Sequence, residues 1–130
     1  MVQRSAAIIP VLASAAAIGA LIAASSPATA AGDATAGKQV FARCAACHST
    51  APGENKIGPS LAGVVGRKSG SEAGYTYSPA LKAANITWDE QTLDKFLANP
   101  AGDVHGTKMF ISVPNATDRE NVIAYLQTLK

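Results

Sequence analysis

Apolar side chains recur along most of the chain at the spacing of helices, and no stretch alternates apolar and polar residues as a half-buried strand does. A first helix is predicted from an N-cap at Asp33 to about Ala45, because Val40, Phe41 and Cys44 share one face. The last helix carries its apolar face at Val122, Tyr125, Leu126 and Leu129. The pattern therefore predicts an all-α fold.

Capping boxes mark the starts of two helices. Residues 87–90, Thr-Trp-Asp-Glu, are predicted to open a helix that runs to Ala98 and is ended by Asn99-Pro100. Residues 117–120, Thr-Asp-Arg-Glu, form a second box ahead of the last helix.

Two long segments, 49–77 and 99–116, carry no periodic pattern and are rich in Gly, Pro, Ser and Asn. After the first of them, Ser78 and Pro79 fit the N-cap and first residue of a short helix that ends near Asn85. Loops of this length are uncommon in a compact domain unless they are functional. We therefore expect them to wrap around a bound group.

The first 30 residues have the pattern of a secretory signal peptide. Arg4 supplies a positive start, residues 6–24 are uncharged and rich in alanine, and residues 28–30, Ala-Thr-Ala, form a cleavage site. The chain is therefore divided into a signal peptide over 1–30 and one domain over 31–130. The alternative interpretation is an uncleaved membrane anchor, because the apolar run is nearly long enough to span a bilayer.

The domain after residue 30 is nearly neutral. The chain has 11 basic and 9 acidic residues, and Arg4 is the only charged residue before position 31, so the formal charge of the domain is +1. No basic run is present, and no nucleic-acid partner is expected. Two cysteines form at most one disulfide. A small exported domain with so few cross-links needs another source of stability, such as a cofactor in its core.

Residues 44–48, Cys-Ala-Ala-Cys-His, contain both cysteines and one of the two histidines. A helical turn places Cys44, Cys47 and His48 on one side. This is the attachment signature of a c-type haem, in which two thiols form thioether links and the imidazole binds the iron. The cysteines could also form a redox dithiol, half of a zinc site or a disulfide. However, the chain shows no βαβ pattern and no zinc-module spacing to His105, and a disulfide leaves His48 unexplained.

From residue 33 to residue 130 the sequence resembles the class I cytochromes c, of the mitochondrial-like bacterial, cytochrome c2 kind. The matching segments are 37–44, 57–61, 66–70, 75–78, 106–110 and 122–126. The resemblance implies a small cytochrome c fold, in which the first and last helices cross and long loops wrap around one covalently attached haem c.

The resemblance also implies roles for individual residues. The carbonyl of Pro59 is expected to accept a hydrogen bond from the His48 ring, and Met109 to be the second axial ligand of the iron. The alternative for Met109 is a core-filling side chain. A haem propionate is expected to be bound by Arg67, Tyr77, Ser78 and Trp88. Their plainer interpretations are a surface arginine, turn residues and a core tryptophan.

An iron with two filled axial positions has no site for a substrate, so the predicted function is one-electron transfer and not catalysis. The protein is expected in the periplasm, as a monomer without stable membrane insertion, in a respiratory or photosynthetic chain. The expected partners dock at the haem edge: a quinol–cytochrome c reductase, an oxidase or a dehydrogenase.

Two other functions stay open at this point. One is a haem enzyme or sensor in which Met109 leaves the iron, and the other is a cytochrome subunit bound permanently to a dehydrogenase. His105 is either an alternative axial ligand or a loop histidine with no special role.

Overall fold

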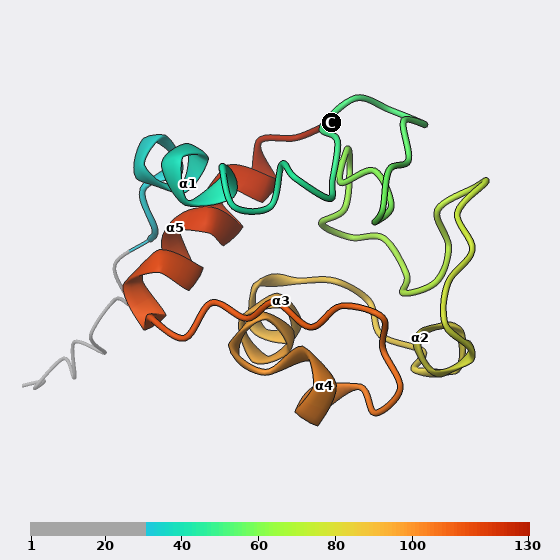
Figure 1. The fold of residues 1–130 in the computed structure, drawn as a ribbon. Coiled ribbons are helices and arrows are strands. Elements are labelled where there is room, and N and C mark those ends of the chain that lie inside the picture. Colours follow the sequence, from blue (N-terminus) through green and yellow to red (C-terminus); the bar gives the residue numbers. More distant parts are fainter. Residues whose placement is uncertain (1–30) are drawn as a thin grey trace, which may run out of the picture.

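A computed structural model describes residues 31–130, which form five helices (Figure 1). The predicted signal peptide over 1–30 lies outside the described residues. Within 31–130 there is no strand, only an isolated bridge between Lys68 and Thr87, so the all-α prediction is confirmed. None of these helices has the length and hydropathy needed to cross a membrane. The helices are α1 (Ala34–Phe41), α2 (Pro79–Ala83), α3 (Glu90–Ala98), α4 (Pro100–Asp103) and α5 (Ala116–Gln127).

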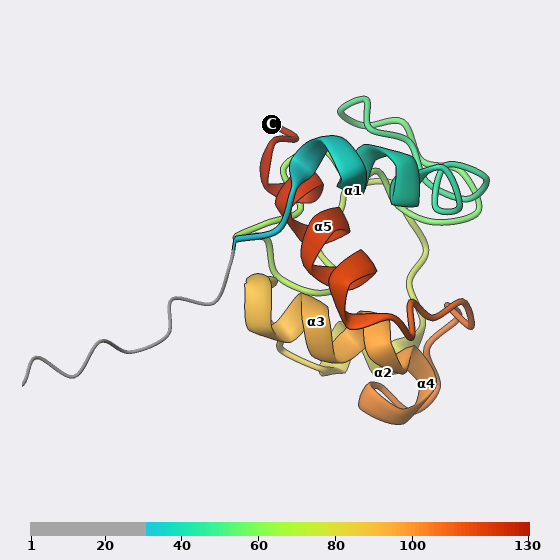
Figure 2. The same cartoon turned by 90° about the vertical axis from the view of Figure 1, so that its left-hand side faces the viewer.

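Helix α1 crosses over α5, so the two ends of the described chain pack together (Figure 2). Gly37 lies at the crossing, where a Cβ atom would overlap the backbone carbonyl of Asn121 on α5. Glycine is therefore the residue that lets the two helix backbones approach this closely. The rings of Phe41 and Tyr125 pack beside the crossing with their centroids 5.2 Å apart. The predicted crossing of first and last helices is confirmed.

Helix α1 begins where predicted but ends earlier. The carboxylate of Asp33 accepts hydrogen bonds from the backbone N–H groups of Thr35 and Ala36, at 2.7 and 3.3 Å. The predicted end near Ala45 is wrong, because the α-helix stops at Phe41. The next three backbone N–H groups, of residues 42–44, bond to carbonyls three positions back. The chain thus enters the Cys-Ala-Ala-Cys-His segment through tighter, 3₁₀-like turns.

The predicted start of α2 is confirmed, and the predicted starts of α3 and α5 are wrong by two residues. The Ser78 hydroxyl accepts from the N–H of Leu81 at 3.1 Å, as an N-cap does. The N-cap of α3 is Asp89, which forms its capping box with Thr92. Thr87 is held extended by its bridge to Lys68, so the helix cannot begin there.

The last helix begins at Ala116 because Asn115 is its N-cap. The Asn115 side chain accepts from the N–H of Asp118 at 2.9 Å. Thr117, the predicted N-cap, therefore lies inside the helix. Asparagine is at least as good an N-cap as threonine, and it comes first along the chain.

The segment 99–116 is not wholly irregular. It begins with the short helix α4, which the sequence analysis missed. Asn99 ends α3 as predicted and also starts α4, because its side chain accepts from the N–H of Gly102 at 3.0 Å.

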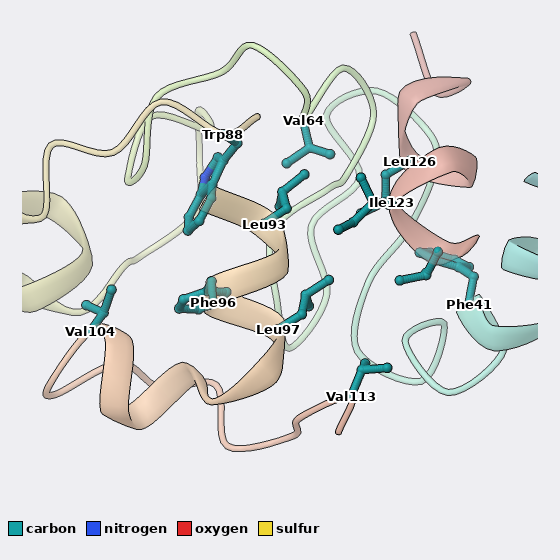
Figure 3. Close-up of a cluster of buried hydrophobic side chains, with 11 residues drawn as sticks. Phe41, Val64, Trp88, Leu93, Phe96, Leu97, Val104, Val113, Ile123 and Leu126 are labelled. Atoms are coloured by element: carbon teal, nitrogen blue, oxygen red, sulfur yellow. The ribbon is translucent and has the colours of Figure 1, made fainter. Parts of the chain in front are cut away.

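The hydrophobic core lies between α3 and the crossing of α1 with α5 (Figure 3). Trp88 and Phe96 pack against each other with ring centroids 5.0 Å apart. Across the core, Ile123 and Leu126 extend from α5 toward them. Most members of this cluster also line a cavity, so the core surrounds an internal space instead of closing on itself. The buried residues are Phe41, Val64, Trp88, Leu93, Phe96, Leu97, Val104, Val113, Val122, Ile123 and Leu126.

Candidate functional site

The cavity has a volume of about 470 Å³, which lies within the range of cofactor pockets. Its walls come from both predicted loops as well as α3 and α5, and they are mainly apolar. The structure brings all nine predicted site residues to these walls: Cys44, Cys47, His48, Pro59, Arg67, Tyr77, Ser78, Trp88 and Met109.

Cys44, Cys47 and His48 occupy one backbone turn at the cavity wall. The carbonyl of Cys44 accepts from the N–H groups of Cys47 and His48, at 3.0 and 2.9 Å. Both thiols are free and half-buried. Burial raises the pKa of the Cys44 thiol, although the charge of Arg43 opposes this. A raised pKa is the opposite of what a reactive redox dithiol needs. Within 31–130 no group of three or more His, Cys, Asp or Glu side chains could hold a metal ion, which disfavours a zinc site.

The ring of His48 is fixed in position and in tautomer. Its Nδ1 donates to the carbonyl of Pro59 at 2.7 Å, which leaves Nε2 as the nitrogen available to a metal. Burial lowers the pKa of His48, so the imidazole stays neutral, as a metal ligand must be. The backbone of Gly58 packs against the ring, and a Cβ atom there would overlap the ring.

Met109 reaches the cavity from a loop that is tied down on both sides. Its backbone N–H bonds to the hydroxyl of Thr107 at 3.3 Å, and the N–H of Thr107 bonds to the carbonyl of Val104 at 3.0 Å. Nζ of Lys108 donates to the carbonyl of Thr76 at 2.8 Å. The thioether is therefore presented by an anchored segment.

The polar side of the cavity centres on Arg67. Its Nη1 donates to the carboxylate of Glu72 at 2.7 Å and its Nη2 to the carbonyl of Ser60 at 2.8 Å. Its Nε is buried without a partner. The hydroxyl of Tyr77 accepts from the backbone N–H of Glu72 at 3.2 Å. Glu72 was missed by the sequence analysis, because a glutamate in a glycine-rich loop carries no signal of its own.

The mouth of the cavity is apolar and exposed. Ile57, Phe110 and Ile111 line the cavity and have exposed fractions of 77, 80 and 56%. Their exposure is not predictable from the sequence, because a loop without periodicity does not indicate which side chains face the solvent. Lys56 and Lys108 flank them, and their ammonium groups donate to backbone carbonyls. We call these three apolar residues the apolar rim.

His105 does not line this cavity. Its Nδ1 lies 3.0 Å from the carbonyl oxygen of Ala101, and its ring faces a separate, open cleft between α2 and α4. The carboxylate of Asp103 and the ammonium of Lys95 form an ion pair at the same cleft. This placement favours the loop histidine over the alternative axial ligand.

The residues around the cavity fit a covalently attached haem. The apolar walls suit a flat macrocycle, the adjacent thiols suit its vinyl groups, and the orphaned Nε–H of Arg67 beside the cavity suits a cofactor carboxylate. A small all-α domain built around such a site defines a c-type haem protein.

The chain belongs to the cytochrome c family, because the family model described as Cytochrome c matches residues 34–130. Cytochrome c2 of Rhodoblastus acidophilus is 49% identical over 102 residues, which cover 77% of this chain and 95% of that protein. Cytochrome c2 of Rhodomicrobium vannielii is 48% identical over 113 residues, covering 85% and 90%. The structure of cytochrome cH from Methylobacterium extorquens aligns with a TM-score of 0.71 at 45% identity and covers 75% of this chain and 99% of its own.

These relatives place the chain among the class I, c2-type bacterial cytochromes, with the small all-α cytochrome c fold. It is a monohaem c-type cytochrome that carries electrons and is not an enzyme. Its cofactor is one covalently bound haem c, and its partners are redox proteins of electron transport chains.

Proposed function

We propose that Cys44 and Cys47 form the two thioether links to the haem and that His48 and Met109 are its axial ligands. One observation carries this proposal: the two thiols, the imidazole and the thioether all line a single cavity, and the imidazole is held by Pro59 with Nε2 free. With these ligands, a haem bound here would offer no open position to a substrate, so the site would serve electron transfer. Arg67, Tyr77, Ser78 and Trp88 are proposed to hold a propionate at the polar side.

The cofactor, when bound, supplies an iron that alternates between the ferrous and ferric states. The chain keeps the surroundings of the iron the same in both states. The bond from His48 to Pro59 prevents rotation of the imidazole, and the anchors at Thr107 and Lys108 hold the Met109 loop. The apolar walls exclude water and favour the ferrous state, which carries less charge.

The apolar rim is proposed as the surface where redox partners dock. Transient partners need a small interface that excludes water without holding the complex together. Ile57, Phe110 and Ile111 supply it, with Lys56 and Lys108 as nearby positive charges. Arg43 adds little attraction, because it is paired with Asp118 at 3.1 Å. The proposed partners are a quinol–cytochrome c reductase, an oxidase or a dehydrogenase, in the periplasm after export by residues 1–30.

The ligands are tested on the protein purified from a host that attaches haem. Mass spectrometry is expected to give one haem per chain and an N-terminus at Ala31. The near-infrared charge-transfer band of a methionine-bound ferric haem is expected in the wild type. Met109→Ala should abolish it, and the matched variant His105→Ala should keep it. A band that survives Met109→Ala, or disappears in His105→Ala, contradicts the proposed ligand set.

A further inference from the structure

Arg67 and Glu72 form an ion pair whose members are both shielded from water. Nη1 of Arg67 lies 2.7 Å from Oε2 of Glu72, and each side chain is 16% exposed. The other ion pairs of residues 31–130 each have at least one member that is 45% exposed or more. Because water screens exposed charges strongly and shielded charges weakly, the charges of Arg67 and Glu72 are screened less than those of the other three pairs.

We propose that the carboxylate of Glu72 sets the reduction potential of this cytochrome by neutralising Arg67 at the cavity wall. The proposal rests on the function given above, in which Arg67 faces the cofactor. Reduction adds one negative charge to the cofactor, so a nearby positive charge favours the ferrous state and a nearby negative charge opposes it. Glu72 cancels the charge of Arg67 and thereby holds the potential down.

Among the described residues, Glu72 is the only hydrogen-bond partner of Arg67 that carries a charge. The other partners of its guanidinium are the carbonyls of Ala62 and Ser60, which are neutral. Its buried Nε–H remains for a further acceptor. Arg67 would therefore offer a haem propionate a guanidinium whose positive charge is already partly neutralised by Glu72.

The position of Glu72 is fixed from both ends. Its carboxylate is held by Arg67, and its backbone N–H donates to the hydroxyl of Tyr77 at 3.2 Å. Burial raises the pKa of Tyr77, so its hydroxyl stays neutral and adds no charge of its own. A carboxylate fixed in this way acts on the cofactor from a constant distance, as a tuning group requires.

Voltammetry at constant pH and salt tests the proposal. Glu72→Gln removes the charge and keeps the shape, and the potential is expected to shift upward. Glu120→Gln removes the same charge from an exposed position on α5 and should leave the potential close to that of the wild type. Glu72→Asp keeps the charge and should stay nearer the wild type than Glu72→Gln. Equal shifts in Glu72→Gln and Glu120→Gln overturn the proposal.

The single variant Glu72→Gln leaves the Arg67 charge without its partner and could fold poorly. The same charge is therefore also removed in the Arg67→Gln variant, where no unpaired charge remains. Arg67→Gln should lower the potential, and Arg67→Gln with Glu72→Gln should raise it again. A double variant with the potential of Arg67→Gln alone contradicts the role of Glu72. A wild type without any reversible wave contradicts the electron-carrier function itself, which separates the two failures.

Discussion

At the scale of single residues, the position of the His48 imidazole ring depends on Gly58, a neighbour in space that has no side chain. Gly58 packs its backbone against the ring, while the next residue, Pro59, accepts the Nδ1 hydrogen bond at 2.7 Å. The two contacts fix both the position and the tautomer of the ring. Two adjacent backbone groups thus leave Nε2 of His48 as the nitrogen available to the proposed iron.

Gly58→Ala should displace the His48 ring, because the added Cβ atom overlaps it. Overpacking of this kind costs about 1–3 kcal/mol of stability. The visible spectrum is expected to change together with the melting temperature. Gly63→Ala is the matched control: its φ of 62° makes alanine strained, but its Cβ atom would make only an ordinary contact, at 4.0 Å, with the backbone of Lys130. It should lose stability without a spectral change, and an unchanged spectrum in Gly58→Ala would argue against the ring contact.

At the scale of elements, helix starts are decided by which side chain reaches the first free N–H groups. Thr117 and Asn115 both have a polar side chain suited to an N-cap, and the structure uses Asn115. This start places Arg119 in the second turn of α5, and its guanidinium donates to the carbonyls of Val113 and Pro114 in the loop before the helix. These two hydrogen bonds tie the first turns of α5 to the end of the loop that carries Met109.

Asn115→Ala should destabilise the protein by about 1 kcal/mol, because α5 loses its N-cap. In a domain of this size that corresponds to a fall of about 4–8 °C in melting temperature. Thr117→Ala should have almost no effect, since Thr117 lies within the helix. Thermal unfolding followed by circular dichroism compares the two variants, and a larger loss in Thr117→Ala would reverse the assignment.

At the scale of the whole molecule, the core is built around the cofactor space. A bare cavity of about 470 Å³ would cost on the order of 10 kcal/mol, at about 24 cal/mol per Å³. Water entering through the mouth makes this an upper bound, yet it is comparable with the whole stability of a small domain, about 5–15 kcal/mol. The haem is therefore expected to act as a structural part of the core.

Cys44→Ala with Cys47→Ala, produced without attached haem, should lose most of its helical circular dichroism and its cooperative thermal transition. The physical reason is that Trp88, Phe96 and Leu126 lose their common contact surface. The wild-type protein with haem, in the same buffer, is the control. A cooperative transition retained by the variant would show that the chain folds without its cofactor.

Much of this protein follows from the sequence by itself. The spacing of Cys44, Cys47 and His48 predicts their shared turn. Helical periods predict α1 and α5, and a capping box with an Asn-Pro end predicts α3, because these patterns involve neighbours along the chain. The predicted N-caps of α3 and α5, Thr87 and Thr117, are wrong because more than one nearby side chain can act as an N-cap. The structure uses Asp89 and Asn115.

The tertiary structure alone decided what distant segments do together. It turned His105 to another cleft, paired Arg67 with Glu72 and exposed the apolar rim. The places of Met109 and Arg67 at the cavity of His48 were predicted from the family resemblance, and not from any local spacing. These features depend on how loops without periodicity fold over a core, and no local spacing encodes a contact between residues far apart in the chain. The sequence by itself thus determined the local Cys-Ala-Ala-Cys-His turn, whereas the Arg67–Glu72 pair and the exposed apolar rim depend on tertiary packing.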